Sequence, residues 1–184
     1  MADIVQEGAP VLRQKAKPVP PELFGTPRLR KMIADMASAL EGELDGVALA
    51  APQIALPYRI FIVRYDRIEP PDDQERKAGE KKEPRVGVYI NPKIIKTSRR
   101  CEEMDEGCLS VRGIYGQTRR HKRATIHAYD EDGHPFTRGA GGILAQVFQH
   151  ETDHLNGVLF TDHAANLYEV QLEGERENHG EFSH

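Results

Sequence analysis

The sequence predicts an α+β fold, in which antiparallel strands pack around a helix near the C-terminus, with a further helix near the N-terminus. Three observations lead to this prediction. Apolar residues recur at spacings of three and four in residues 27–42 and again in residues 142–155, which indicates two amphipathic helices. Several strand-like segments lie between them, without another strongly marked helix. This order favours an antiparallel sheet over alternating strand–helix–strand units.

The composition is that of an ordinary globular protein. The chain has 184 residues, of which 39% are hydrophobic and 29% are charged. We assign residues 1–168 to one domain, with a charged insertion at about 67–84, and residues 169–184 to a polar tail. The formal net charge of -4 argues against nucleic acid as the main partner. No apolar run is long enough for a membrane span and residues 1–10 lack a signal core, so the expected location is the cytoplasm.

The first helix has a recognisable start. Prolines make residues 8–26 an extended, irregular entry. Thr26 is a typical N-cap, and Pro27 suits the first helical position. The apolar side of the helix, which ends near Gly42, consists of Leu29, Met32, Ile33, Met36 and Leu40.

The middle of the chain is rich in strand signals. Branched and aromatic residues dominate the predicted strands, which are residues 47–51, 59–65, 86–95 with an interruption at Asn91-Pro92, and 124–129 followed by a turn at 130–133. Residues 67–84 hold eleven charged residues in eighteen, so we expect a surface loop there. The basic run at residues 119–123 is interpreted as a solvated entrance to a strand, with an RNA-facing role as the alternative.

The second helix carries the strongest chemical signal, the sequence His150-Glu151-Thr152-Asp153-His154. Positions i and i+4 lie on the same face of a helix, so the two imidazoles can bind one metal ion. Glu151 is one residue along and can act on water without being a ligand. Asn156-Gly157 is expected to end the helix. The competing interpretation is two solvated histidines beside ordinary acids.

A catalytic metal site needs a third protein ligand. His163 and Glu169 follow the motif at distances that zinc proteases could use, whereas Phe160 stands where a metzincin would have its third histidine. Upstream, Cys108 lies beside a glycine in the segment EGCLS, and a thiolate is a strong ligand for borderline metals. Cys108 is therefore the preferred candidate, and Cys101 is interpreted as an ordinary strand or turn cysteine.

A third segment, GVALAAPQ at residues 46–53, combines small residues with a terminal glutamine. Small side chains let a substrate backbone approach, as in strand addition, and the Gln53 amide could polarise a carbonyl. Taken alone, the segment is better interpreted as a tightly packed core strand. These three segments in this order resemble the peptide deformylase family, whose motifs are G-x-G-x-A-A-x-Q, E-G-C-L-S and H-E-x-D-H. The resemblance covers roughly residues 4–165.

The resemblance implies a function and a set of roles. Its metal ligands would be Cys108, His150 and His154, holding Fe(II) natively, with Zn(II), Ni(II) or Co(II) able to replace it. The enzyme would remove the formyl group from the N-terminal formylmethionine of new polypeptides and release formate, with a possible transient ribosome contact. Glu151 would be the base, and Gln53 and the Leu109 N–H would stabilise the oxyanion. The resemblance also implies a substrate cleft, lined by Gly46, Val47, Ala48, Gly107 and Leu109, with Tyr115, Gln146 and Val147 as further candidates for the methionine pocket.

Two positions depart from the family pattern. Ala48 stands where the family usually has glycine, and its methyl group is expected to intrude on the substrate. Arg112 stands where proline is usual and is expected to place positive charge beside the cleft. Three alternatives stay open. One is a zinc endopeptidase of the H-E-x-x-H kind, and another is a Cys-His nucleophilic hydrolase. The third, which these two departures motivate, is a catalytically weak module that binds formylated or nascent N-termini or the ribosome.

Overall fold

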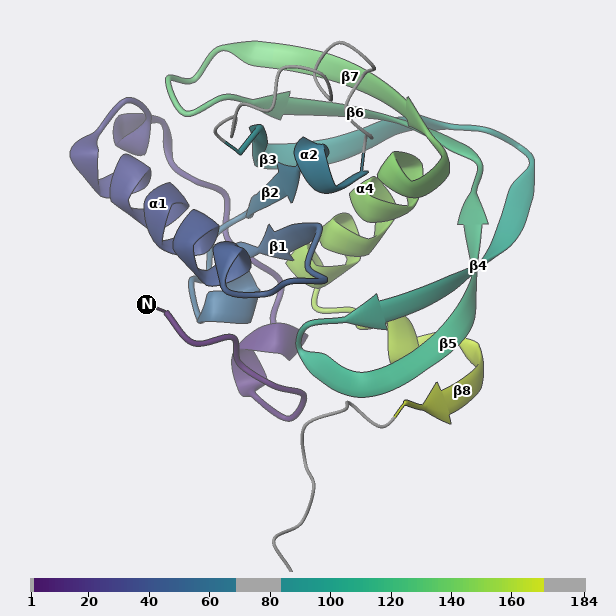
Figure 1. Ribbon diagram of the computed structural model, residues 1–184. Helices are drawn as coiled ribbons and strands as arrows, with labels where there is room; N and C mark the ends of the chain where they lie inside the picture. The colour runs from purple at the N-terminus through teal and green to yellow at the C-terminus, as the bar shows by residue number, and fades with distance from the viewer. Residues whose placement is uncertain (1, 69–83, 171–184) are drawn as a thin grey trace, which may run out of the picture.

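The computed structural model describes residues 2–68 and 84–170, which form two antiparallel sheets and three α-helices (Figure 1). The larger sheet has five strands in the order β1-β2-β3-β6-β7, and the smaller has three in the order β4-β5-β8. The strands are β1 (Ala48–Ala50), β2 (Ile60–Arg64), β3 (Val86–Thr97), β4 (Cys101–Cys108), β5 (Val111–His121), β6 (Arg123–Tyr129), β7 (Pro135–Gly141) and β8 (Ala165–Glu169). The α-helices are α1 (Pro27–Glu41), α2 (Tyr65–Ile68) and α4 (Gly142–Leu155). The predicted α+β class is confirmed.

Helix α1 begins as its sequence predicts. The Thr26 hydroxyl accepts a hydrogen bond from the Leu29 N–H at 3.3 Å, and Pro27 occupies the first turn. The apolar side is fully buried at Leu29, Met36 and Leu40. Helix α1 therefore covers one face of the larger sheet.

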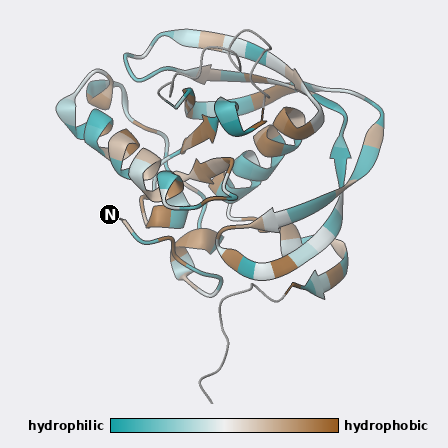
Figure 2. Ribbon diagram, viewed as in Figure 1, coloured by the Kyte–Doolittle hydropathy of each residue, from teal (hydrophilic) through white to brown (hydrophobic). Residues whose placement is uncertain are grey.

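Strand β2 divides the core between the two faces of this sheet. Successive strand residues point to opposite faces. Ile60 and Ile62 pack in the cluster under α1, whereas Phe61 and Val63 pack in the cluster under α4. Hydrophobic residues accordingly concentrate on β1, β2 and α4 (Figure 2).

Helix α4 is held at both ends by glycines in the left-handed region. Gly142, at its first position, has φ 56°, and Gly157 has φ 78° just beyond its end. A side chain at Gly157 would place a Cβ 2.7 Å from the Arg13 carbonyl oxygen, so only glycine fits there. The glycine stop predicted at Asn156-Gly157 is thus confirmed. Because α4 is packed against the larger sheet, the histidine motif faces the interior of the molecule.

The smaller sheet is the main element that the sequence analysis missed. Strands β4 and β5 form a long hairpin, with Cys101 paired to His121 at one end and Gly107 to Tyr115 near the other. Most buried side chains of this hairpin are polar, namely Glu106, Thr118 and Arg120, and Val111 is the buried apolar one. A strand that buries polar groups lacks the apolar alternation by which strands are recognised.

Three local expectations change in the structure. The expected loop at 67–84 begins with the end of α2, and residues 69–83 lie outside the described part of the chain. The expected tail at 169–184 overlaps β8, and the Val170 N–H still donates to Gly113 O at 2.8 Å. Residues 171–184 also lie outside the description. The basic run at 119–123 is not one solvated patch, because Arg120 is buried. Among the described residues, no helix is long and apolar enough to cross a membrane.

Candidate metal centre and active-site cleft

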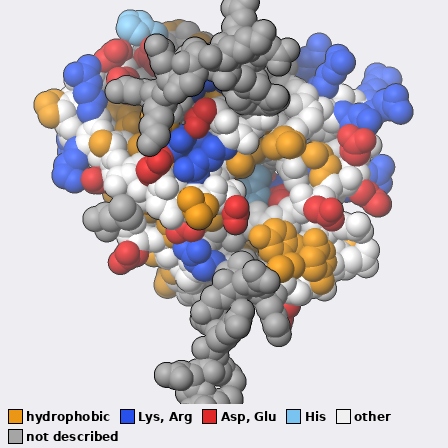
Figure 3. Space-filling model, in the orientation of Figure 1, with side chains coloured by type: hydrophobic (Ala, Val, Ile, Leu, Met, Phe, Trp, Pro, Cys, Tyr) orange, Lys and Arg blue, Asp and Glu red, His pale blue; other side chains and the backbone are white. Residues whose placement is uncertain are grey.

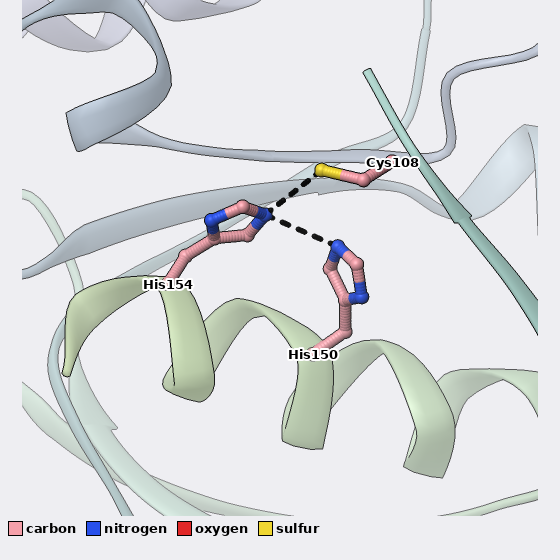
Figure 4. Close-up of side chains that lie close together, drawn as sticks. All are labelled: Cys108, His150 and His154. Carbon is pink, nitrogen blue, oxygen red and sulfur yellow. Dashed lines mark hydrogen bonds between the residues drawn. The ribbon is translucent and has the colours of Figure 1, made fainter. Parts of the chain in front are cut away.

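Three side chains that could hold a metal ion converge between β4 of the smaller sheet and helix α4 (Figure 4). The Cys108 sulfur lies 3.1 Å from His154 Nε2, which lies 3.2 Å from His150 Nε2. All three ligand atoms fall within 4.8 Å of one another. The structure thus brings together the thiol of β4 and both imidazoles of α4, as the sequence analysis expected.

The donor set fits a small divalent cation. Bonds of about 2.0–2.3 Å in a tetrahedral site place neighbouring donors roughly 3.3–3.6 Å apart. The measured separations of 3.1 and 3.2 Å are close to this. Burial lowers the pKa of His154 well below its ordinary value, which favours the neutral ring that can offer a lone pair to a metal. Three protein donors leave one tetrahedral position for water or substrate.

The thiol of Cys108 is surrounded by hydrogen-bond donors. The Ser110 N–H points to the sulfur at 3.4 Å, and the Gln53 side-chain amide does so at 3.6 Å. Gln53 is itself held in place, because its Oε1 accepts from the Ala50 N–H at 2.8 Å. These contacts fix the position of the sulfur beside the two histidines.

A buried ion pair contacts His150, one of the three side chains of the centre. Arg120 donates to both carboxylate oxygens of Glu106, at 2.9 and 2.6 Å, and Glu106 accepts from His150 Nδ1 at 2.5 Å. Burial opposes ionisation of Glu106, but the bonds from His150 and Arg120 outweigh it and hold its pKa well below the usual range. The carboxylate fixes the His150 ring so that Nε2 faces the other two ligands.

Removing Arg120 should destabilise the fold strongly. In Arg120→Met the Glu106 carboxylate would remain buried without its bidentate partner, which typically costs about 3–5 kcal/mol. Urea unfolding at a fixed metal concentration measures the change in the free energy of unfolding. Arg119→Met is the matched control, because Arg119 is the exposed neighbour on the same strand. Equal stability of both variants would show that the buried pair contributes little.

Glu151 lies outside the cluster of Cys108, His150 and His154, and its carboxylate is buried. Its side chain is 3% exposed, and its Oε2 has no hydrogen-bond partner among residues 2–68 and 84–170. Burial raises the pKa of Glu151 to about 7. A carboxylate with such a pKa can take up and release a proton near neutral pH.

An open cleft leads to this centre, with a histidine visible in the hollow at the middle of the space-filling view (Figure 3). Three elements form its walls: the edge strand β1 of the larger sheet, the edge strand β4 of the smaller sheet, and one side of helix α4. The predicted residues that line it are Gln53, Gly46, Val47, Ala48, Gly107, Cys108, Leu109, Tyr115, Gln146, Val147, His150 and Glu151. His154 lies behind them and is 1% exposed.

The rival ligands lie away from the centre. His163 contacts the Asp153 carboxylate at 3.5 Å, and Glu169 pairs with Ile114 in the sheet. The Cys101 sulfur lies 3.4 Å from His121 Nδ1 at the far end of the β4–β5 hairpin. None of these three residues joins the cluster of Cys108 and the two motif histidines within the described part of the chain.

Comparison with known proteins identifies the family. A family model described as polypeptide deformylase matches residues 1–170. The chain belongs to this family. It is 37% identical over 158 residues to a peptide deformylase of Brucella suis, covering 86% of this chain and 81% of that protein. It is also 36% identical over 169 residues to the chloroplastic peptide deformylase 1A of Solanum lycopersicum, covering 90% of this chain but 60% of that longer relative.

Solved peptide deformylases share the fold. A structure from Synechococcus elongatus in complex with actinonin has a TM-score of 0.74 at 36% identity, covering 90% of this chain and 79% of that one. A Met-Ala-Ser-bound structure from Acinetobacter baumannii has a TM-score of 0.74 at 29% identity, covering 87% and 97%. Both likenesses extend over nearly the whole described domain.

Some supporting residues of this deformylase-family site were not singled out from the sequence. Asp153 accepts from Arg120 Nη1 at 2.7 Å, and the Thr118 hydroxyl donates to Glu106 at 2.5 Å. Asp153 is the fixed acid of the H-E-x-D-H motif, so its place three residues after His150 was an available signal. Thr118 could be found only from the pairing of β4 with β5.

Proposed function

We propose that this chain is a peptide deformylase, which hydrolyses the N-formyl group of the N-terminal formylmethionine of new polypeptides and releases formate. The observation that carries this proposal is the convergence of Cys108, His150 and His154 beside the buried base Glu151, at the inner end of an open cleft. Family membership supports the same activity.

The proposed cofactor is one divalent ion held by the thiolate and the two imidazoles, Fe(II) natively, with Zn(II), Ni(II) or Co(II) as substitutes. The mixed sulfur and nitrogen donors suit all four ions, so the donor set alone does not choose among them. Such an ion supplies Lewis-acid activation of water and of the formyl carbonyl.

The chain's own residues then perform the proton transfers. Glu151 takes the proton from the attacking water and delivers it to the leaving amine, for which its raised pKa of about 7 is suited. The Gln53 amide, already oriented by Ala50 and 3.1 Å from the Ser110 hydroxyl, can donate to the oxyanion. The backbone N–H of Leu109 is the second proposed donor.

The substrate backbone is proposed to lie between the two free strand edges. Strand β1 is the edge of the larger sheet and β4 the edge of the smaller. An extended peptide can bond to such edges by strand addition. Gly46, Val47 and Ala48 would line one side of it, with Gly107 and Leu109 on the other.

The two departures from the family pattern have modest consequences in this arrangement. Ala48 is 8% exposed and packs in the core cluster under α4, so its methyl group lies mostly in the interior. Arg112 donates to both oxygens of Glu43, at 3.0 and 2.6 Å, across the cleft mouth. Its positive charge is therefore compensated. Neither change argues for a module that has lost catalysis.

Formate release from formyl-Met-Ala-Ser by anaerobically prepared, iron- or nickel-loaded protein tests this function. Met-Ala-Ser is the ligand named for the Acinetobacter baumannii structure, and formylation makes it a substrate. Turnover with formate as product is the expected result. Binding of the peptide without turnover would favour a recognition module, and cleavage of internal peptide bonds would favour an endopeptidase.

A further inference from the structure

A row of side chains crosses the smaller sheet beside the metal centre. Gly107 of β4 is paired with Tyr115 of β5, and Tyr115 is paired with Tyr168 of β8. Directly paired residues on neighbouring strands point to the same face of a sheet. Gly107 immediately precedes the ligand Cys108, so this row begins at the cleft.

Tyr115 is turned toward the cleft because Gly107 has no side chain. A Cβ on Gly107 would lie 2.6 Å from Tyr115 Cε1, so the tyrosine ring covers the space that a side chain would need. Tyr115 itself lines the cleft. A peptide bound along the β4 edge would thus meet an aromatic ring next to the residue that carries the thiol.

Tyr168 supports this ring from the side away from the cleft. The two tyrosine rings are stacked, with centroids 6.0 Å apart and an interplanar angle of 22°. Tyr168 is also 45% exposed, although an aromatic side chain of this size gains from burial. Figure 3 shows hydrophobic side chains gathered over β5 at the edge of the hollow. A hydrophobic surface thus borders the cleft on the side of the smaller sheet, and Tyr115 belongs to the cleft itself.

We propose that Tyr115 and Tyr168 form an aromatic platform that binds an apolar or aromatic side chain of the substrate peptide, downstream of the formylated residue. This proposal assigns Tyr115 to a downstream side chain and not to the methionine pocket that the family resemblance implies. This inference rests on the proposed function, because it extends the same cleft. The formylated residue must reach the centre at Cys108, and the platform starts one residue from it. A side chain that leaves the bound peptide over the smaller sheet therefore lies on the tyrosine rings. Residues on α4, among them Ile143 and Val147, line a different wall of the cleft.

The platform predicts a sequence preference that Tyr168 controls. Formate release is measured with metal-loaded full-length protein on formyl-Met-Xaa-Ala and formyl-Met-Ala-Xaa, where Xaa is Ala, Leu, Phe or Asp. Phe at one of the two positions is expected to raise kcat/KM over Ala by roughly three- to ten-fold, the worth of one aromatic contact. Tyr168→Ala should reduce this ratio toward one, and Tyr168→Phe should retain it.

Leu167→Ala provides a matched control. Leu167 is 50% exposed on the same strand, but its side chain meets the position of Gly116 and so lies on the opposite face from Tyr168. It should leave the Phe-to-Ala ratio unchanged. Three results would overturn the platform. The unmodified protein could show a Phe-to-Ala ratio of kcat/KM equal to one, Tyr168→Ala could leave that ratio unchanged, or the preference could follow the charge of Xaa.

Product binding separates this inference from the proposed function. If formyl-Met-Ala-Ala is hydrolysed without any aromatic preference, the platform fails and the function stands. If no peptide releases formate, the function fails, and calorimetry with Met-Ala-Phe, Met-Phe-Ala and Met-Ala-Ala still decides the platform. Tighter binding of a phenylalanine peptide that is lost in Tyr168→Ala supports it, and equal binding of all three peptides refutes it.

Discussion

Glu151→Gln should lower kcat on a formylated peptide by roughly 10²–10⁴-fold, the usual contribution of a positioned general base. The amide keeps the shape and burial of the carboxylate but cannot accept the proton of the attacking water. Because Glu151 lies outside the ligand cluster of Cys108, His150 and His154, bound metal should stay near the unmodified level. Steady-state formate release and metal analysis on the same sample measure the two effects.

An exposed acid of the same cleft provides the control for this change. Asp105 is an exposed residue that lines the cleft at the β4 edge, and its backbone carbonyl accepts from the Gln146 amide at 2.9 Å. Asp105→Asn removes a carboxylate from the cleft without removing the proposed base, so it should change kcat far less. Retention of full turnover by Glu151→Gln would refute the assignment of the base, whatever the metal content.

The parts of the site that lie on one helix were predictable from sequence. His150, Glu151 and His154 are spaced by the period of α4, and that period fixes which side chains share a face. Local caps were predictable for the same reason, since Thr26 and Gly157 act on their own helices. In each case the decisive interaction spans only a few residues along the chain.

Long-range contributions required either the family resemblance or the coordinates. Cys108 lies 42 positions before His150 in the sequence, and no periodicity connects them. The hairpin that carries Cys108 buries Glu106 and Arg120, whose charges conceal the strand pattern. From the sequence, Tyr168 was only the last residue of the predicted domain, before the polar tail. The pairing of β8 with β5 is what brings it beside Tyr115. The burial of polar side chains and the pairing of segments far apart in the sequence are therefore the features that could not be predicted from the sequence pattern.

Cys108→Ala should have the other large effect, on metal affinity and therefore on turnover. Removing a residue that hydrogen-bonds to a metal ligand typically lowers metal affinity by about 10–100-fold. Removing a ligand itself should lower the affinity by more than this. The thiolate is one of three protein donors, and the two histidines alone would leave two of four positions to solvent. Equilibrium dialysis against a metal buffer measures the affinity, with formate release measured in parallel.

Cys101→Ala makes this experiment specific to the site. Its thiol is also half-buried on β4, but it contacts His121 at the far end of the hairpin. Cys101→Ala should keep both metal and activity, which excludes a general effect of removing a thiol from this strand. If Cys108→Ala instead retained metal as tightly as the unmodified protein, a carboxylate or a further histidine would have to be the third ligand. The centre would then be that of a zinc endopeptidase, and the proximity of the sulfur to His154 would have no role in binding the ion.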